Sequence, residues 1–370
     1  MALNTKSDSS LVMRPGDARY LFRTLWWPPL RRGSRVAVIG AAVWCAAFVV
    51  SAQPGDEART PWGHPDLQAV WDFRTITPLE RPAELAGKVV FTEEEAAEYQ
   101  TLENRRQNRD LVDPTKGGAL YPPESQGGVV PYNEFWYDRG TTVVEDRRTS
   151  LIVDPPHGRL PPRRPGAIEQ IGSAGEDLPG VLPVRYRAGG IGADGPEARG
   201  LGERCLLGFN SGPPLIPSAY NNNIQLFQTR THVIIYHEMV HDTRIVPLDA
   251  RPHLSDEIRQ WMGDARGRWE NDTLVVETTN FTDKTASFSP AITSAVGTGT
   301  TLTLTERFTR VDQETLLYEY TVDDPAIFTR RFTAAIPMQR SELPVFEYAC
   351  HEGNRGLANI LAGARLADPD

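Results

Sequence analysis

Seven short runs in the C-terminal half of the sequence alternate apolar and polar residues, and this alternation constrains the fold more than any other feature. The runs are Ile224–Thr229, Val233–Glu238, Arg244–Leu248, Thr273–Phe281, Thr301–Val311, Thr315–Val322 and Phe328–Ile336. A period of two places every second side chain on the same face of a β-strand. Hairpin-turn residues, Asn271-Asp272 and Asp312-Gln313-Glu314, separate some of the runs. The pattern predicts a mainly β protein, an antiparallel meander that closes into a barrel or sandwich of lipocalin-like type.

The remaining local signals predict a helix and long loops around this meander. Thr92 and Glu95 form a capping box, which begins a helix that reaches about Arg109. Shorter expectations are strands at Leu67–Phe73, Phe135–Tyr137 and Ser150–Asp154, a short helix at Ser255–Met262, and surface loops from Pro161 to Gly202. We expect residues 66–220 to pack as a helix- and loop-rich part on a meander of residues 221–370, so that both belong to one compact unit.

Residues 1–52 predict a targeting segment. Three arginines precede the apolar run Val36–Val50, and the small residues Ser51-Ala52 follow it. This order is typical of a secretory signal with its cleavage site. The run of about 15 residues is shorter than the roughly 20 that cross a bilayer as a helix, which favours a cleaved signal over a permanent anchor. Residues 53–65 would then form a linker, and we expect the mature protein to be exported, either to the periplasm or outside the cell.

The charge balance argues against two classes of partner. The chain has a formal net charge of −9 at pH 7, and residues 1–52 alone carry +5, so their removal leaves −14. A strongly acidic surface repels phosphate backbones and anionic lipid headgroups. We therefore expect no nucleic-acid partner, no membrane association after cleavage, and a small molecule as ligand or substrate.

Two cysteines, Cys205 and Cys350, remain in the mature chain. An even pair in an oxidising compartment is typical of a disulfide, and two buried free thiols or one reactive thiol are the alternatives. A bond that closes this long loop would stabilise the fold by about 5 kcal/mol in the chain-entropy model.

Polar residues concentrate between His232 and His253, and this cluster is the strongest candidate for chemistry. Its members are His232, His237, Glu238, His241, Asp242, Arg244 and His253. The string His237-Glu238-Met239-Val240-His241 is the zinc metalloprotease signature, in which one helix places both imidazoles around the metal while the glutamate activates water. His253 or Glu257 would supply the third ligand.

The neighbouring residues oppose the helix that this motif needs. Val233-Ile234-Ile235-Tyr236 and Ile245-Val246-Pro247 favour strands. Residues four apart on a strand are separated by roughly 13 Å, too far to share one zinc ion. We therefore expect no cofactor, and a zinc hydrolase with His237, His241 and His253 as ligands is the alternative.

An extended chain gives these side chains a different use, because Tyr236, Glu238, Asp242 and Arg244 would then share one face and line a polar pocket. Glu238 would act as the base, and His241 as the acid or as its partner. Arg244 would steady a developing anion, with Asp242 as the orienting group. This arrangement suits a lyase, hydratase or isomerase that acts on a small organic molecule.

Two interpretations without catalysis compete with this mechanism. Glu238 and Asp242 would equally form a structural ion-pair network with Arg244. A non-catalytic binder of a sugar or a lipophilic ligand would use the same pocket. If the pocket binds a substrate or another ligand, Tyr220 and Asn222 at its mouth would contact that molecule together with Tyr236. Whether the protein is an enzyme stays open at this point.

Five ordered phrases resemble a family of exported bacterial proteins, most of them hypothetical. They are TPWGHPDLQ at residues 60–68, RTSLIVDPP at 148–156, YNNN at 220–223, GRWENDTLVV at 267–276 and EYACHEGN at 347–354. A further family phrase, Glu-x-x-His-Asp-x-Arg-Ile, is similar to residues 238–245 and does not require His237. The resemblance implies export and carries no particular activity.

Overall fold

The structure is a computed structural model, and it describes residues 58–367 except 114, 117–132, 168, 172–194, 197–199, 292–293 and 351–354. The predicted signal segment and the start of the predicted linker lie outside these residues. Within the described ranges, no helix combines the length and the apolar character that a membrane span needs.

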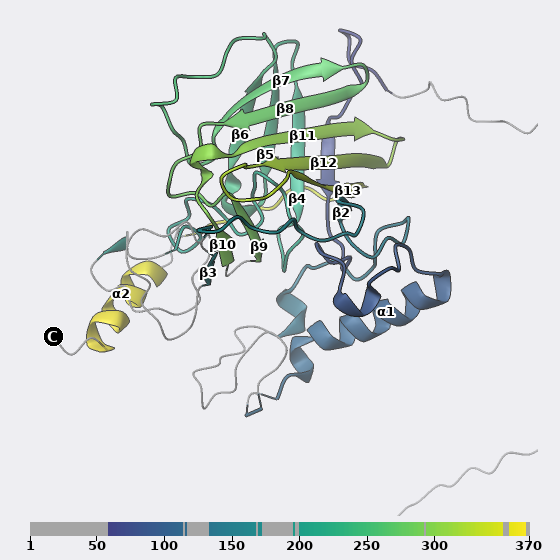
Figure 1. Ribbon diagram of the computed structural model, residues 1–370, viewed down its shortest axis with the longest axis vertical. Helices are drawn as coiled ribbons and strands as arrows, with labels where there is room; N and C mark the ends of the chain where they lie inside the picture. The colour runs from purple at the N-terminus through teal and green to yellow at the C-terminus, as the bar shows by residue number, and fades with distance from the viewer. Residues whose placement is uncertain are drawn as a thin grey trace, which may run out of the picture. The chain divides into compact units, whose positions relative to one another are not determined.

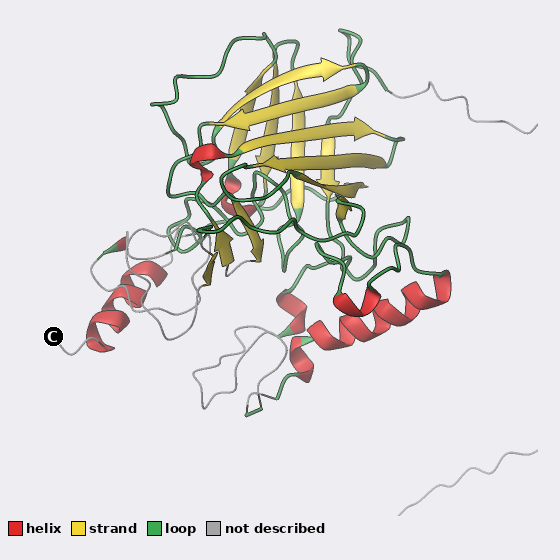
Figure 2. Ribbon diagram, in the orientation of Figure 1, coloured by secondary structure: helices red, strands yellow, loops and turns green. Residues whose placement is uncertain are grey.

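The protein is mainly β, as the alternating runs predict (Figures 1 and 2). Its main sheet is antiparallel and has the order β6-β5-β4-β1-β13-β12-β11-β8-β7, with β2 paired to β13. The strands of this sheet are β1 (Ala69–Asp72), β2 (Ile152–Asp154), β4 (Asn223–Gln228), β5 (His232–His237), β6 (Thr243–Pro247), β7 (Asp264–Glu270), β8 (Thr273–Thr279), β11 (Thr303–Arg310), β12 (Thr315–Asp323) and β13 (Phe332–Ser341). A small second sheet holds β3 (Glu169–Ile171), β10 (Ser294–Val296) and β9 (Phe288–Ala291).

Two α-helices and several short 3-10 turns accompany the sheets in the described part of the chain. In α1 (Glu93–Gln107), Thr92 and Glu95 form a capping box, each side chain accepting a hydrogen bond from the backbone N–H of the other residue. The second helix is α2 (Gly356–Ala367). The 3-10 turns are η1 (Ala83–Leu85), η2 (Arg109–Leu111), η4 (Glu134–Trp136), η6 (Met239–His241) and η7 (Gly299–Thr301).

A strand from the N-terminal part joins two meanders of the main sheet. The first meander is β4-β5-β6, and the second runs through the hairpin β7-β8 into β11-β12-β13. β1 pairs with β4 on one side and with β13 on the other. The loop-rich part of the chain therefore supplies a central strand of the sheet.

The predicted closure into a barrel is not found. Among the described residues, no ladder of hydrogen bonds joins the edge strands β6 and β7. The sheet is still strongly curled, as the bond from Arg244 of the edge strand β6 to Glu306 of β11 shows. Gly267 of β7 lies against the side chains of Val246 and Leu248, which a Cβ atom at Gly267 would approach to 2.8 and 2.7 Å. Side-chain packing, and not backbone pairing, thus fills the seam between the two edges.

The inner face of the curled sheet holds the main core. The largest fully buried side chains in this core are Trp71, Phe73, Phe281, Phe288, Phe308, Tyr318, Tyr320, Phe328 and Phe332. Burial of each such ring stabilises the fold by about 1.5–3 kcal/mol. The aromatic core therefore accounts for much of the stability and leaves the inward polar residues as the exceptions that need explanation.

Two predicted elements are wrong. Residues 135–137 do not form a strand, because Glu134–Trp136 is a 3-10 turn in which Tyr137 N donates to Glu134 O. Residues 255–262 do not form a helix. Gln260 N donates instead to Asn280 O (2.9 Å), and Gln260 O accepts from Thr282 N (3.1 Å), so bonds to a distant segment replace helical ones.

Cys205 and Cys350 form the predicted disulfide, with their Cα atoms 6.3 Å apart. The predicted loop region from Pro161 to Gly202 contains the short strand β3, and most of its remaining residues lie outside the described ranges.

Candidate functional site

The predicted polar cluster is extended chain interrupted by one tight turn. β5 ends at His237, and β6 begins at Thr243 after the turn. Val240 and His241 have φ angles of 60° and 46° in this turn, a left-handed conformation that is unfavourable for residues with a Cβ atom. The HEMVH string therefore lacks the helix that the zinc motif needs. In the residues that the structure describes, no group of three or more His, Cys, Asp or Glu side chains is placed to hold one metal ion.

Glu238 and His241, the expected base and acid, both hold another segment of the chain. Glu238 is buried, and its two oxygens accept hydrogen bonds from Asn223 Nδ2 (2.8 Å) and Phe346 N (3.3 Å). His241 Nδ1 lies 3.1 Å from the carbonyl oxygen of Tyr348 and must donate to it, since a carbonyl only accepts. A carboxylate with a donor on each oxygen is poorly placed to take a proton from a substrate.

Arg244 extends into the curled sheet and pairs with Glu306 of β11. Its Nη1 and Nη2 atoms donate to the two carboxylate oxygens at 2.5 and 2.9 Å, and both side chains are buried. The Tyr318 hydroxyl of β12 donates a third bond to Glu306 (2.8 Å) and accepts one from Leu215 N (3.1 Å). We call Arg244, Glu306 and Tyr318 the inner cluster.

Burial and neighbouring charges shift the pKa values of Arg244 and Tyr318 in the inner cluster. Burial alone would lower the pKa of Arg244, but the adjacent Glu306 carboxylate outweighs burial and the pKa is raised. Burial raises the pKa of Tyr318 well above its usual 10, and the negative charge of Glu306 adds to the rise. At neutral pH the arginine is charged and the tyrosine is neutral. The Arg244–Glu306 ion pair therefore carries no net charge.

Three buried polar atoms beside the inner cluster have no hydrogen-bond partner among the described residues. They are Arg244 Nε, Tyr320 Oη and Thr278 Oγ1. Tyr320 is the cross-strand partner of Glu306, and Thr278 is the partner of Leu304, two residues from Glu306 along β11. Cross-strand partners point to the same face of a sheet. Buried polar groups almost always have a partner, so three exceptions around one ion pair require a cause.

The sequence prediction missed Glu306 and Tyr318, although one signal marked the glutamate. In β11 the buried positions are Leu304, Glu306, Phe308 and Arg310. A charged residue at the inward parity of an otherwise apolar run predicts a buried partner or a ligand. Nothing in the local sequence indicates that the partner is Arg244, 62 residues away.

The expected substrate-binding residues contact other parts of the chain. Asn222 is buried, and its amide bonds to Ser218 and to Asp138 O, which is a structural role. The ring of Tyr220 packs edge-on against Phe209, with centroids 5.1 Å apart. Tyr236 lies at an outward position of β5, between the buried residues Ile235 and His237.

The remaining members of the predicted cluster separate in the fold. His237 is buried at the end of β5. His253 lies between two other carboxylates, with Nδ1 2.9 Å from Asp264 and Nε2 3.4 Å from Glu277. Asp242 contributes a smaller charge interaction that helps to raise the pKa of Arg244. Of the expected catalytic residues, Asp242 and Arg244 are thus in electrostatic contact.

Two hollows of the described surface lie elsewhere. One of about 360 Å³ is lined by Arg74, Thr75, Thr142, Val143, Val144, Glu145, Pro337 and Gln339. The other, of about 490 Å³, is lined by Leu102, Arg105, Arg106 and Leu111 of α1 and η2. In the first hollow Arg74 is already paired with Asp72 and Asp138. Neither hollow has the unpartnered buried groups that distinguish the inner cluster.

Comparisons with known proteins give no match. No family model fits the chain, and no curated protein and no solved structure shows significant similarity to it.

Proposed function

We propose that the protein binds a small, neutral, oxygen-containing molecule inside its curled sheet, beside the inner cluster. The observation that supports this proposal is the set of three unpartnered buried atoms, Arg244 Nε, Tyr320 Oη and Thr278 Oγ1. Each buried polar group that stays unsatisfied costs about 1–3 kcal/mol. Three such groups on the inner face of the sheet are costly against a total stability of about 5–15 kcal/mol, and a bound molecule would satisfy them.

The charge of the site selects the class of ligand. Because Arg244 and Glu306 neutralise each other, a charged ligand would be buried without a counter-ion, which is unfavourable. The available groups are one N–H donor and two hydroxyls, which pair well with a carbonyl, ether or hydroxyl oxygen. The ring of Tyr318 packs at a tilt against the rings of Phe308 and Tyr320, with centroids 5.0 and 5.8 Å apart. A ligand with an apolar body and one oxygen-bearing head suits these surroundings.

Binding has better support than acid–base catalysis. Each oxygen of Glu238 accepts a hydrogen bond, and so does each oxygen of Glu306. Neither carboxylate keeps an oxygen without a donor, so neither is poised to remove a proton from a substrate. We therefore favour a non-catalytic ligand-binding role for an exported protein over a lyase, hydratase or isomerase that uses Glu238.

Two isosteric substitutions, Tyr320→Phe and Thr278→Val, test the proposal because each removes one unpartnered hydroxyl. We expect each to raise the free energy of unfolding of the ligand-free protein by about 1 kcal/mol, since an unsatisfied buried group is lost. We expect the same two changes to reduce retention of the bound molecule. Urea unfolding measures the stability, and native mass spectrometry of protein purified from the exported fraction measures the retained mass.

Thr333→Val is the matched control, because the Thr333 hydroxyl already bonds to the Thr321 hydroxyl at 2.8 Å. It should lower the stability slightly and leave the retained mass unchanged. If Tyr320→Phe and Thr278→Val both lower the stability and leave retention unchanged, the hydroxyls serve the folded protein and the proposed site is refuted.

A further inference from the structure

The outer face of the first meander, β4-β5-β6, carries an apolar row. Phe227 of β4 is the cross-strand partner of Ile234 in β5, and Ile234 is also the partner of Ile245 in β6. Each of the three lies between two buried residues of its strand and therefore points outward. Phe227 is 41% exposed and Ile245 is 64% exposed. Because cross-strand partners are neighbours on one face, the three side chains form one continuous row.

The other outward positions of these three strands hold no Asp, Glu, Lys or Arg. They are Asn223, Gln225, His232, Tyr236, Thr243 and Pro247. In a chain of which 24% is charged, such a surface offers nothing that attracts a charged partner. We call the outward side of β4, β5 and β6 the neutral face.

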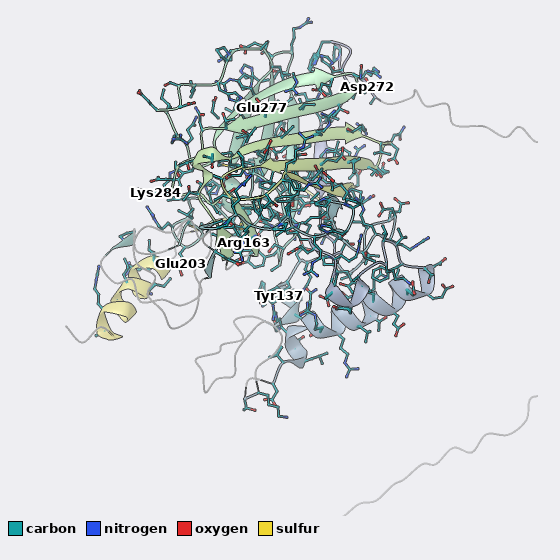
Figure 3. All side chains as sticks on the ribbon, in the orientation of Figure 1. Tyr137, Arg163, Glu203, Asp272, Glu277 and Lys284 are labelled. Atoms are coloured by element: carbon teal, nitrogen blue, oxygen red, sulfur yellow. A yellow bond between two sulfur atoms is a disulfide. The ribbon has the colours of Figure 1, made fainter. Side chains whose placement is uncertain are left out.

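The second meander covers an outward apolar residue with its own side chains. Val275 of β8 has Arg268 of β7 and Arg307 of β11 as cross-strand partners on its two sides, and it is fully buried. Both arginines bond to Glu270, which holds their aliphatic stems beside the valine. Glu277, labelled in Figure 3, is the next outward residue of β8 and adds to this charged surface. The strands of the neutral face carry no such long charged side chain to cover their apolar row.

We infer that the neutral face binds the same face of a second copy of this chain, so that the protein forms a two-fold symmetric dimer. A two-fold contact joins identical surfaces, so the surface must not repel itself. Two copies with a net charge of −9 each repel one another, but the outward positions of β4, β5 and β6 bring no like charges together. Two sheet faces pack about 10 Å apart with interdigitated side chains, and this packing buries the row of each copy.

The size of the neutral face determines the strength of the dimer. Three strands of five or six residues cover about 15 by 20 Å, or about 300 Å². Each partner contributes about 800 Å² to a stable complex. The dimer is therefore weak and forms only as the concentration rises. The inference is independent of the proposed function, because the neutral face points away from the inner cluster.

Sedimentation equilibrium of the purified full chain tests the dimer over concentrations from about 10 μM to about 1 mM, the range in which a weak contact dissociates. We expect the average mass of the wild-type protein to rise toward twice that of the monomer. Ile245→Glu should weaken the dimer at least about tenfold, because it brings like charges together across the two-fold axis. Ile245→Thr keeps a β-branched residue in the strand, so it should weaken the dimer even if the charged variant fails to fold.

Val311→Glu is the matched control, because Val311 is an apolar residue that follows β11, lies outside the neutral face and is 54% exposed. It should leave the association unchanged. Wild-type protein that stays monomeric at the highest concentration, or equal weakening by Ile245→Glu and Val311→Glu, would overturn the inference. So would a dimer that both Ile245 variants leave intact. A wild-type dimer that weakens as the salt concentration rises would place charged side chains in the contact and would also overturn it.

Discussion

Glu306 is the residue that departs most clearly from the pattern of its strand. It occupies an inward position between Leu304 and Phe308, where the alternation of β11 calls for an apolar side chain. A buried charge is tolerated only with a partner that stays bonded to it. Arg244 and the Tyr318 hydroxyl supply three bonds to this carboxylate. The inner cluster is therefore internally coupled, and a change at one member should affect the others.

Glu306→Gln should lower the free energy of unfolding by about 3–5 kcal/mol, because it leaves the Arg244 charge buried without a counter-ion. The paired change Arg244→Met with Glu306→Leu should cost much less, since it removes both charges. Asp154→Asn, in the exposed pair with Arg330, should change the stability by less than about 1 kcal/mol. Urea unfolding measures all three, and equal losses at the buried and the exposed pair would contradict the argument.

The half-buried Tyr99 predicts a loss of stability at alkaline pH. Burial raises the pKa of Tyr99 to about 12, and the charge of Glu103 adds to the rise. Between pH 10, the usual value, and this raised value the unfolded chain releases the proton while the folded chain keeps it, so the stability falls as the pH rises. Below pH 10 the contribution of the tyrosine is fully present.

Tyr99→Phe should reduce this alkaline loss by about 1 kcal/mol, because solvent screening weakens the effect at a half-buried ring. Urea unfolding at a series of pH values from 9 to 12 measures the difference. A slope that is identical in wild type and Tyr99→Phe would rule out this origin.

At the scale of elements, the β7–β8 hairpin depends on one backbone conformation. Glu270 and Thr273 are cross-strand partners, which leaves Asn271 and Asp272 as a two-residue turn. Asn271 has a φ of 55°, as the tight turns of β-hairpins require. Asparagine adopts this left-handed region more readily than other residues with a Cβ atom.

Asn271→Val should therefore lower the free energy of unfolding by about 1–2 kcal/mol, because a β-branched residue resists a positive φ. Asn271→Gly should leave it nearly unchanged, since glycine adopts this conformation freely. Thermal or urea unfolding of the two variants checks the pair, and an equal effect of both substitutions would show that the side chain matters and the backbone does not.

At the scale of the whole molecule, β1 joins the two meanders into one sheet. Trp71 in the middle of this short strand is fully buried, and its Nε1 donates to Leu67 O at 2.8 Å. The strand pairs with β4 and β13 at once, so loss of its anchoring weakens both meanders together. We therefore expect the sheet to unfold in one step.

Trp71→Ala should lower the free energy of unfolding by about 3–5 kcal/mol and should keep a single transition. Far-ultraviolet circular dichroism and tryptophan fluorescence should report the same midpoint, because both meanders lose the same central strand. Trp136→Ala, at a side chain that is 65% exposed, should have little effect. Separate transitions for the two signals in the wild-type protein would show that the meanders fold independently.

The strands and their turns were predictable because their signals are local. The period of two needs only five to nine neighbouring residues to set which side chains face inward, and it placed strands at β4, β5, β6, β8, β11 and β12. The disulfide followed from a count of cysteines. The helix expected at residues 255–262 failed because its backbone bonds to residues 280 and 282, which no local signal reports.

By itself, the sequence indicated most of the long strands, the positions of two hairpin turns and a possible disulfide between the two cysteines. Only the tertiary structure decided what the polar residues do, because partners are chosen by the curl of the sheet and not by spacing along the chain. Arg244 meets Glu306 across 62 residues, and Glu238 meets Phe346 across 108. Side chains that are neighbours in the sequence between His232 and His253 therefore serve separate purposes, and the buried site forms where strands distant in the chain converge.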